Sequence, residues 1–177
     1  MNPQAYELWH EHFSGMIRMN PRWDAYDRIA LELFRKKKSG LKVVEFGFTP
    51  KVSDWSKDRC FTQQLEWLGE QELGEGLVIT QEEKNKALCE RSYRKVKCHA
   101  HLEGIPNFFD EVLEGFSLKE ADLVFMGEAM SGAYDWALLP KGCLVAVDQS
   151  NVFFEDTDFP EFKKVYSSNG ITLWRKT

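Results

Sequence analysis

The sequence lacks the features of secreted, membrane-spanning and disordered chains. It has only four cysteines, with no CxxC pair and no disulfide-like spacing. No apolar stretch approaches the roughly 18 residues that suggest a membrane span. The start, MNPQAYELWHEHF, has no basic region followed by an apolar run, so we expect no secretory signal. These absences predict a soluble cytoplasmic protein, away from membranes, with reduced and mostly buried thiols.

Several common catalytic motifs are also missing. The sequence has no GxSxG nucleophile elbow, no Walker loop and no HExxH pair. Its net charge of −5 argues against non-specific nucleic-acid binding over the whole surface, although a local basic patch stays open. The basic run 35–38 could contact phosphate, but such a run is more often a solvated helix end.

The composition, in contrast, is that of one folded domain. The 177 residues are 43% hydrophobic and 14% aromatic, enough for a real core. Apolar residues three and four apart predict a helix over 3–19, which Asn20-Pro21 ends, and a second helix over 22–37 before Gly40. We interpret the aromatic residues of these helices as ordinary core. Two alternatives are that they cover a ligand pocket or form a homodimer face. The residues concerned are Trp9, Phe13, Trp23 and Tyr26.

From residue 41 onward, short apolar runs alternate with helical stretches. This alternation predicts right-handed βαβ units and a parallel sheet. The tail over 161–175 predicts an antiparallel hairpin, because Asn169-Gly170 is a strong turn signal. The expected strands are 41–47, 76–80, 96–101, 122–126 and 143–147, with helices near 57–70, 82–94, 107–116 and 131–139.

Two of these runs carry a family resemblance. They read ADLVFMGE over 121–128 and LLPKGCLVAVDQ over 138–149, with Tyr134 between them. This segment resembles the fourth and fifth strands of class I S-adenosylmethionine (SAM)-dependent methyltransferases, and is most similar to small-molecule O-methyltransferases of the catechol and caffeoyl-CoA type. The resemblance covers about 41–177. It implies a Rossmann-like α/β domain with strand order 3-2-1-4-5-7-6, in which residues 1–40 form a helical cap of the same domain.

The resemblance also implies where SAM would bind. The family has a glycine-rich loop after its first strand, and Glu45 and Gly47 keep part of that pattern. Phe48 and Pro50 stand where small residues are usual, so the loop is degenerate, and Gly47 could simply end a strand. The residues expected on the cofactor side are Glu45, Gly47, Thr49, Glu82, His101 and Gly127.

Two of these residues have an equally ordinary alternative. Glu82 or Glu83, after the second strand, could bind the ribose hydroxyls, but acids are also favoured where a helix begins. His99 and His101 alternate onto one face of the third strand. A partly buried, hydrogen-bonded histidine is the default interpretation of that pair.

The catechol-type members of the family hold Mg²⁺ at the ends of strands four and five. Asp148 and Gln149 match the second part of that site, whereas Gly127 stands where the family has its first Asp. Glu128 is one residue later and could reach back. The resemblance therefore implies Asp148 and Gln149 as metal ligands, and Glu128 and Asp148 as catalytic residues.

These observations leave three hypotheses for function. The first is a SAM-dependent methyltransferase acting on a small-molecule hydroxyl. The second is a catalytically inactive relative that binds a protein or nucleic acid, which the degenerate loop favours. The third is a doubly wound binding domain for another nucleotide, against which the C-terminal hairpin counts.

Overall fold

The computed structural model describes residues 3–37, 39–100, 118–128, 136–150 and 160–177. Its helices are α1 (Pro3–Met19), α2 (Arg22–Lys36), α3 (Thr62–Glu70) and α4 (Glu83–Ser92), with 3₁₀ turns η1 (Leu118–Glu120) and η2 (Trp136–Leu138). Its strands are β1 (Leu41–Phe46), β2 (Gly74–Thr80), β3 (Val96–Ala100), β4 (Leu123–Met126), β5 (Leu144–Asp148), β6 (Phe162–Ser168) and β7 (Ile171–Lys176).

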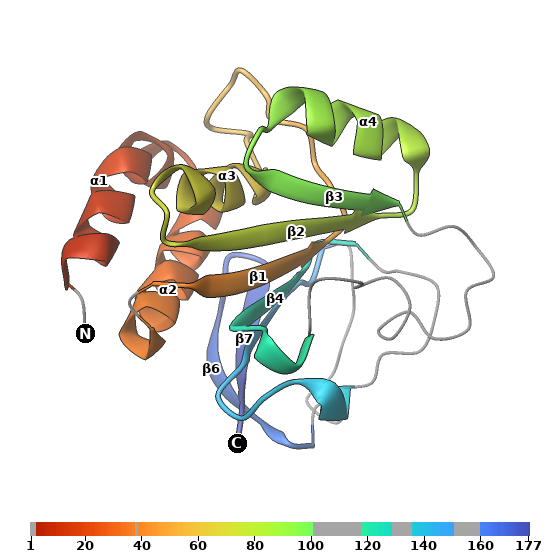
Figure 1. Cartoon of the computed structure of the whole chain (residues 1–177). Coiled ribbons are helices and arrows are strands. Elements are labelled where there is room, and N and C mark those ends of the chain that lie inside the picture. Colours follow the sequence, from red (N-terminus) through yellow and green to blue (C-terminus); the bar gives the residue numbers. More distant parts are fainter. Residues whose placement is uncertain (1–2, 38, 101–117, 129–135, 151–159) are drawn as a thin grey trace.

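The strands form a seven-stranded sheet in the order β3-β2-β1-β4-β5-β7-β6 (Figure 1). The pairs from β3 to β5 are parallel, whereas β7 runs antiparallel between β5 and β6. This is the predicted Rossmann-like class I methyltransferase order, and the prediction is confirmed. Strand β1 lies inside the sheet, between β2 and β4, so both of its edges are hydrogen-bonded.

Strands β1, β2, β4 and β5 have apolar residues on both faces, because both faces are covered, whereas one face of β3 carries Lys97 and His99. On β1, Leu41 and Val43 belong to the core cluster that α1, α2, α3 and α4 share. Val44 and Phe46 belong to a second cluster on the opposite face, which includes residues of η1 and η2. The parallel run therefore lies between two hydrophobic layers.

The aromatic residues of the N-terminal helices are core, as expected. The side chains of Trp9, Phe13, Trp23 and Tyr26 are each at most 3% exposed. Their rings form a chain of tilted and edge-on contacts with centroids 5.1–5.2 Å apart, which is the arrangement that aromatic pairs favour. These helices are thus fixed against the sheet by burial. Whether the chain also forms a homodimer stays a prediction.

The C-terminal hairpin has the predicted turn. Asn169 and Gly170 both have positive φ, of 53° and 78°, as the two central residues of a type I′ turn require. The turn lies beside the end of β5, where the Gln149 N–H donates to the Gly170 carbonyl at 2.8 Å. This contact brings the hairpin to the edge of the sheet where β5 ends.

Some predicted elements differ from the structure or lie outside its described part. The helix expected near 57–70 begins only at Thr62, because 47–61 forms a long connection after β1. The helix expected over 107–116 lies outside the described residues, and only 136–138 of the one near 131–139 is described. Among the described residues, no helix has the length and apolar character needed to cross a membrane.

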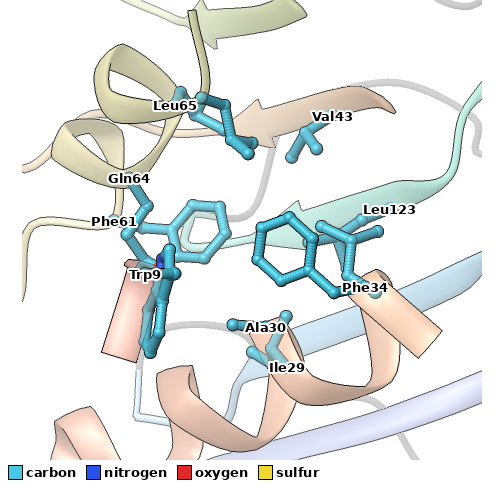
Figure 2. A pocket seen from close by; sticks show the side chains of 11 residues that line it. Trp9, Ile29, Ala30, Phe34, Val43, Phe61, Gln64, Leu65 and Leu123 are labelled. Carbon is cyan, nitrogen blue, oxygen red and sulfur yellow. The ribbon is translucent and has the colours of Figure 1, made fainter. Parts of the chain in front are cut away.

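A small cavity remains in the core where α1, α2 and α3 meet the sheet (Figure 2). Its volume is about 10 Å³, room for one water molecule at most. The only polar side chain among its described lining residues is Gln64, which is 4% exposed. Within the described part of the chain, the Nε2 of Gln64 has no hydrogen-bond partner. A buried donor without a partner costs stability.

We expect Gln64→Met to raise the free energy of unfolding by about 1 kcal/mol, because it replaces this amide with an apolar side chain of similar size. The matched control is Gln63→Met. Gln63 Nε2 donates to Asp58 Oδ2 at 3.1 Å, so its loss should lower stability. Urea unfolding followed by tryptophan fluorescence measures both changes. Equal losses of stability in the two variants would contradict the interpretation.

Candidate functional site

The candidate site lies at the carboxyl ends of β1, β2 and β4. From β1 the chain proceeds outward to β2 and β3, whereas β4 lies on the other side of β1 and leads to β5. The strand order therefore reverses between β1 and β4. In open α/β sheets, ligands bind outside the carboxyl ends of strands at such a switch point. Gly47 ends β1 here, and Gly127 and Glu128 follow β4.

Gly47 has to be a glycine, for a reason that the sequence did not show. Its φ of +92° is one that side chains rarely adopt. A Cβ at this position would overlap the Cβ of Glu128 and lie 3.2 Å from its Oε2. The backbone N–H groups of Gly127 and Glu128 both donate to the Phe46 carbonyl, at 2.9 and 3.0 Å. The absent side chain thus lets Glu128 lie directly against the end of β1.

Glu128 and Glu82 form the charged part of this edge. Burial, and secondly the negative charge of Glu82, raise the pKa of the Glu128 carboxyl. Glu82 directly precedes α4, is exposed, and pairs with Lys84 at 2.7 Å. Two carboxylates from different strand ends therefore act on each other across the end of β1. Such mutual repulsion is relieved when a cation binds nearby.

Glu45 lies away from this pair. It is 2% exposed, and its Oε2 accepts a hydrogen bond from the Thr62 hydroxyl of α3 at 2.8 Å. Burial raises the pKa of Glu45 to about 8. The side chain is therefore largely protonated at neutral pH and contacts α3. The resemblance placed Glu45 on the cofactor side, and that role stays a prediction.

The other expected cofactor residues are spread out. Thr49 is exposed in the connection after β1, and Pro50 beside it is exposed too. Phe48 is 8% exposed and packs edge-on against Tyr93 of the α4–β3 connection, with ring centroids 6.4 Å apart. It turns into the core and does not fill the switch point. His101 lies outside the described residues, so its role stays a prediction.

Asp148, expected as a metal ligand and catalytic residue, forms contacts within the protein. Its Oδ2 forms a buried ion pair with Arg22 of α2. Its Oδ1 accepts from the Ser150 hydroxyl at 2.6 Å and from the Ser150 N–H at 3.0 Å. Arg22 also donates to the Tyr26 hydroxyl at 3.1 Å, so this network lies inside the protein. Asp148 therefore joins α2 to the end of β5.

These contacts do not fit a magnesium site. A hard cation needs several free oxygen ligands, and both oxygens of Asp148 already accept from a cation or from Ser150. Gln149, the second expected ligand, is half-buried, and because only its backbone N–H is bound to Gly170, the role of its side-chain oxygen stays a prediction. Among the described residues, no cluster of three or more His, Cys, Asp or Glu side chains is arranged to hold a metal ion.

Sequence reasoning missed Arg22 and Thr62. Arg22 lies 126 positions before Asp148, and Thr62 lies 17 positions after Glu45. No local pattern links either pair. The only signal in the sequence was that Asp148 and Glu45 end apolar strands and are therefore expected to be buried. A buried carboxylate requires either a partner or a proton.

Comparison with known proteins supports the fold. No family model and no curated protein matches the chain. Among solved structures, a TehB-like SAM-dependent methyltransferase from Corynebacterium glutamicum matches with a TM-score of 0.50 and 8% identity, covering 99% of this chain and 100% of that one. A putative S-adenosylmethionine-dependent methyltransferase from Listeria monocytogenes matches with a TM-score of 0.39 and 10% identity, over 82% and 72%. At 8% identity the first similarity establishes the class I methyltransferase fold alone.

Glu45 generates a pH prediction. Its pKa is 4.5 when exposed and about 8 in the folded protein, so unfolding releases a proton between these values. The free energy of unfolding should therefore fall as the pH rises from about 4.5 to about 8. Glu45→Gln should remove this slope and be more stable at pH 8, by on the order of 3–5 kcal/mol. Glu70→Gln, an exposed change on α3, should keep the slope. Identical pH profiles for Glu45→Gln and the unaltered protein would refute the burial effect.

The Arg22–Asp148 pair generates a stability prediction. Arg22→Met should lower the free energy of unfolding by about 3–5 kcal/mol, because it leaves a buried carboxylate without a cation. The double variant Arg22→Met/Asp148→Leu should regain much of that loss. Lys57→Met breaks an exposed pair of 3.7 Å with Asp54 and should change stability by less than about 0.5 kcal/mol. Guanidinium unfolding tests all three. If Arg22→Met is harmless while Asp148→Asn abolishes a Mg²⁺-dependent activity, Asp148 is a metal ligand after all.

Proposed function

We propose that this chain binds SAM at the carboxyl ends of β1, β2 and β4 and transfers its methyl group to a small-molecule hydroxyl. The observation that carries the proposal is the position of Glu128, which lies against Gly47 at the end of β1, with Glu82 following the end of β2. The class I methyltransferase fold, whose solved representatives above are named SAM-dependent, supports it.

The charge of this edge fits SAM better than it fits an anionic nucleotide. SAM carries a positive sulfonium and an ammonium group, which a carboxylate attracts, and two ribose hydroxyls, which a carboxylate can accept from. Glu128 lies half-buried against Gly47, where burial strengthens its attraction for a cation. Glu82, exposed after β2, is the candidate for the ribose hydroxyls. Phosphate groups would meet repulsion from both.

The residues present define a short mechanism. SAM, when bound, supplies an electrophilic methyl group for in-line transfer. Glu128 accepts the proton of the acceptor hydroxyl, a role that suits a carboxylate whose pKa lies above its ordinary value. The switch point orients donor and acceptor. Because Asp148 is paired with Arg22, no step is assigned to a metal.

A second candidate function has its own supporting observation. Glu128 occupies the space beside Gly47 that the family's glycine-rich loop offers to its cofactor, and the loop holds no second glycine. These features favour a catalytically inactive relative that acts as a binding module. The two candidates differ in one measurable property, the affinity for SAM.

We expect SAM to bind and to raise the free energy of unfolding by about 2.7 kcal/mol at 100 times its dissociation constant. Glu128→Gln and Glu82→Gln should each weaken SAM binding about tenfold or more, because each removes an attractive charge. Glu90→Gln removes an exposed charge farther along α4 and should leave the affinity within about twofold. Isothermal titration calorimetry and thermal melting measure these effects.

S-adenosylhomocysteine sharpens this test, because it lacks the methyl group and the positive sulfur. The loss of affinity in Glu128→Gln should be larger for SAM than for S-adenosylhomocysteine. Activity is then measured as S-adenosylhomocysteine formed with a phenolic acceptor. A flat melting curve at millimolar SAM would favour the inactive binding module.

A further inference from the structure

Away from the strand ends, a groove runs between α2 and the C-terminal hairpin. It consists of two adjoining hollows of about 680 and 370 Å³ that share Glu32, Arg35, Gly142 and Arg175. Eight lysines and arginines are among the described residues that line it, with Glu32 as the one acidic residue. We call this feature the basic groove. It lies where β5 begins, roughly 13 Å along that strand from Asp148.

The groove concentrates positive charge on an otherwise acidic chain, whose net charge is −5. Part of the basic run noted in the sequence lines the groove, since Arg35 and Lys36 at the end of α2 lie on its wall. Lys163 and Lys164 on β6 and Lys141 before β5 are exposed. Such a field attracts polyanions over the whole of its length.

Glu32 organises the arginines of the groove. It is 4% exposed and accepts from Arg28 at 2.9 Å, from Arg35 at 3.2 Å and from Arg175 at 2.6 Å. One carboxylate cannot neutralise three guanidinium groups, and each has five donor N–H bonds. The arginines are therefore held in place with donors to spare. Preorganised cations lose less entropy when an anion binds.

The charges extend in a line across the sheet. Four residues on neighbouring strands lie side by side as backbone partners across the sheet. They are Lys163 on β6, Arg175 on β7, Leu144 on β5 and Leu123 on β4. Lys36 binds Asp122, the residue before Leu123, at 3.1 Å. Three strand spacings of about 4.8 Å make this row roughly 14 Å long. A single phosphate group contacts only part of such a row, whereas an extended chain of phosphates follows it.

We propose that the basic groove binds the sugar–phosphate backbone of nucleic acid without regard to base sequence. None of the described residues lining it is aromatic, so it offers phosphate contacts and no stacking platform. Protein interfaces depend on buried aromatic and apolar anchors, and the exposed large apolar side chains of the described residues lie elsewhere, on α1 and the connection after β1. An acidic protein is therefore the weaker candidate. The inference does not depend on methyl transfer.

The test uses a fluorescein-labelled 20-nucleotide oligo(dT), measured by anisotropy between 50 and 200 mM NaCl. The full chain should bind, with an affinity that falls linearly with salt on a log–log plot. In Lys163→Gln/Lys164→Gln, the slope should decrease by about 1.4 and binding should weaken about 25-fold at 0.1 M salt, if each lysine contacts one phosphate.

The matched control is Lys95→Gln/Lys97→Gln, which removes the same charge from two exposed lysines at the β3 edge of the sheet. It should weaken binding less than twofold. Equal weakening in both variants would show attraction by overall charge and overturn the proposal. So would absence of binding at 50 mM salt, displacement by poly-glutamate at equal charge, or displacement by stoichiometric ATP. SAM titrations on the same samples report separately on the proposed methyltransferase.

Discussion

The buried pair of Arg22 and Asp148 fixes the relation between the N-terminal helices and the sheet. It joins the start of α2 to the end of β5, and two further ion pairs hold the other end of α2. These are Glu32 with Arg175 of β7, and Lys36 with Asp122 before β4. A helix held at both ends over three strands cannot shift without leaving a buried charge unpaired, which is costly. The position of the basic groove, which has α2 as one wall, follows from this constraint.

Three carboxylates at or near the strand ends show how burial determines what a side chain can do. Asp148 is buried beside a cation, and both of its oxygens already accept from Arg22 or Ser150. Glu45 is buried without a cation, so it stays protonated up to a pKa of about 8. Glu128 is only partly buried and faces another acid. Of the three, Glu128 alone keeps an unsatisfied charge that a ligand could neutralise.

The sequence predicts the order of elements well because each rests on local chemistry. Strands β1, β2, β4 and β5 each contain a short apolar run, and the turn at Asn169-Gly170 follows from residues that tolerate positive φ. The site was harder to predict, because its contacts join distant segments. Family resemblance assigned Asp148 to a metal, yet the residue that engages it lies 126 positions away. Phe48 stands where the family has small residues, and the structure shows that its ring packs against Tyr93 in the core.

Gly47 is a residue that the sequence identified correctly but could not explain. The glycine itself was noticed from the sequence, and its positive φ agrees with a tight exit from β1. The reason for it lies in Glu128, which follows a strand far along the chain and occupies the space of the missing side chain. A resemblance can thus identify the correct residue while the neighbour that explains it is visible only in three dimensions.

The two proposed sites carry opposite charge at opposite ends of the parallel strands. Acids lie where β2 and β4 end, whereas the basic groove lies where β5 begins. Strand β5 alone separates these ends by roughly 13 Å, more than the Debye length of about 8 Å at physiological ionic strength. A polyanion in the groove is therefore largely screened from Glu82 and Glu128. A cationic cofactor at the acidic edge and a phosphate chain in the basic groove can therefore bind the same molecule together, because each edge attracts one ligand and repels the other. The overall charge of −5 alone does not predict such a division.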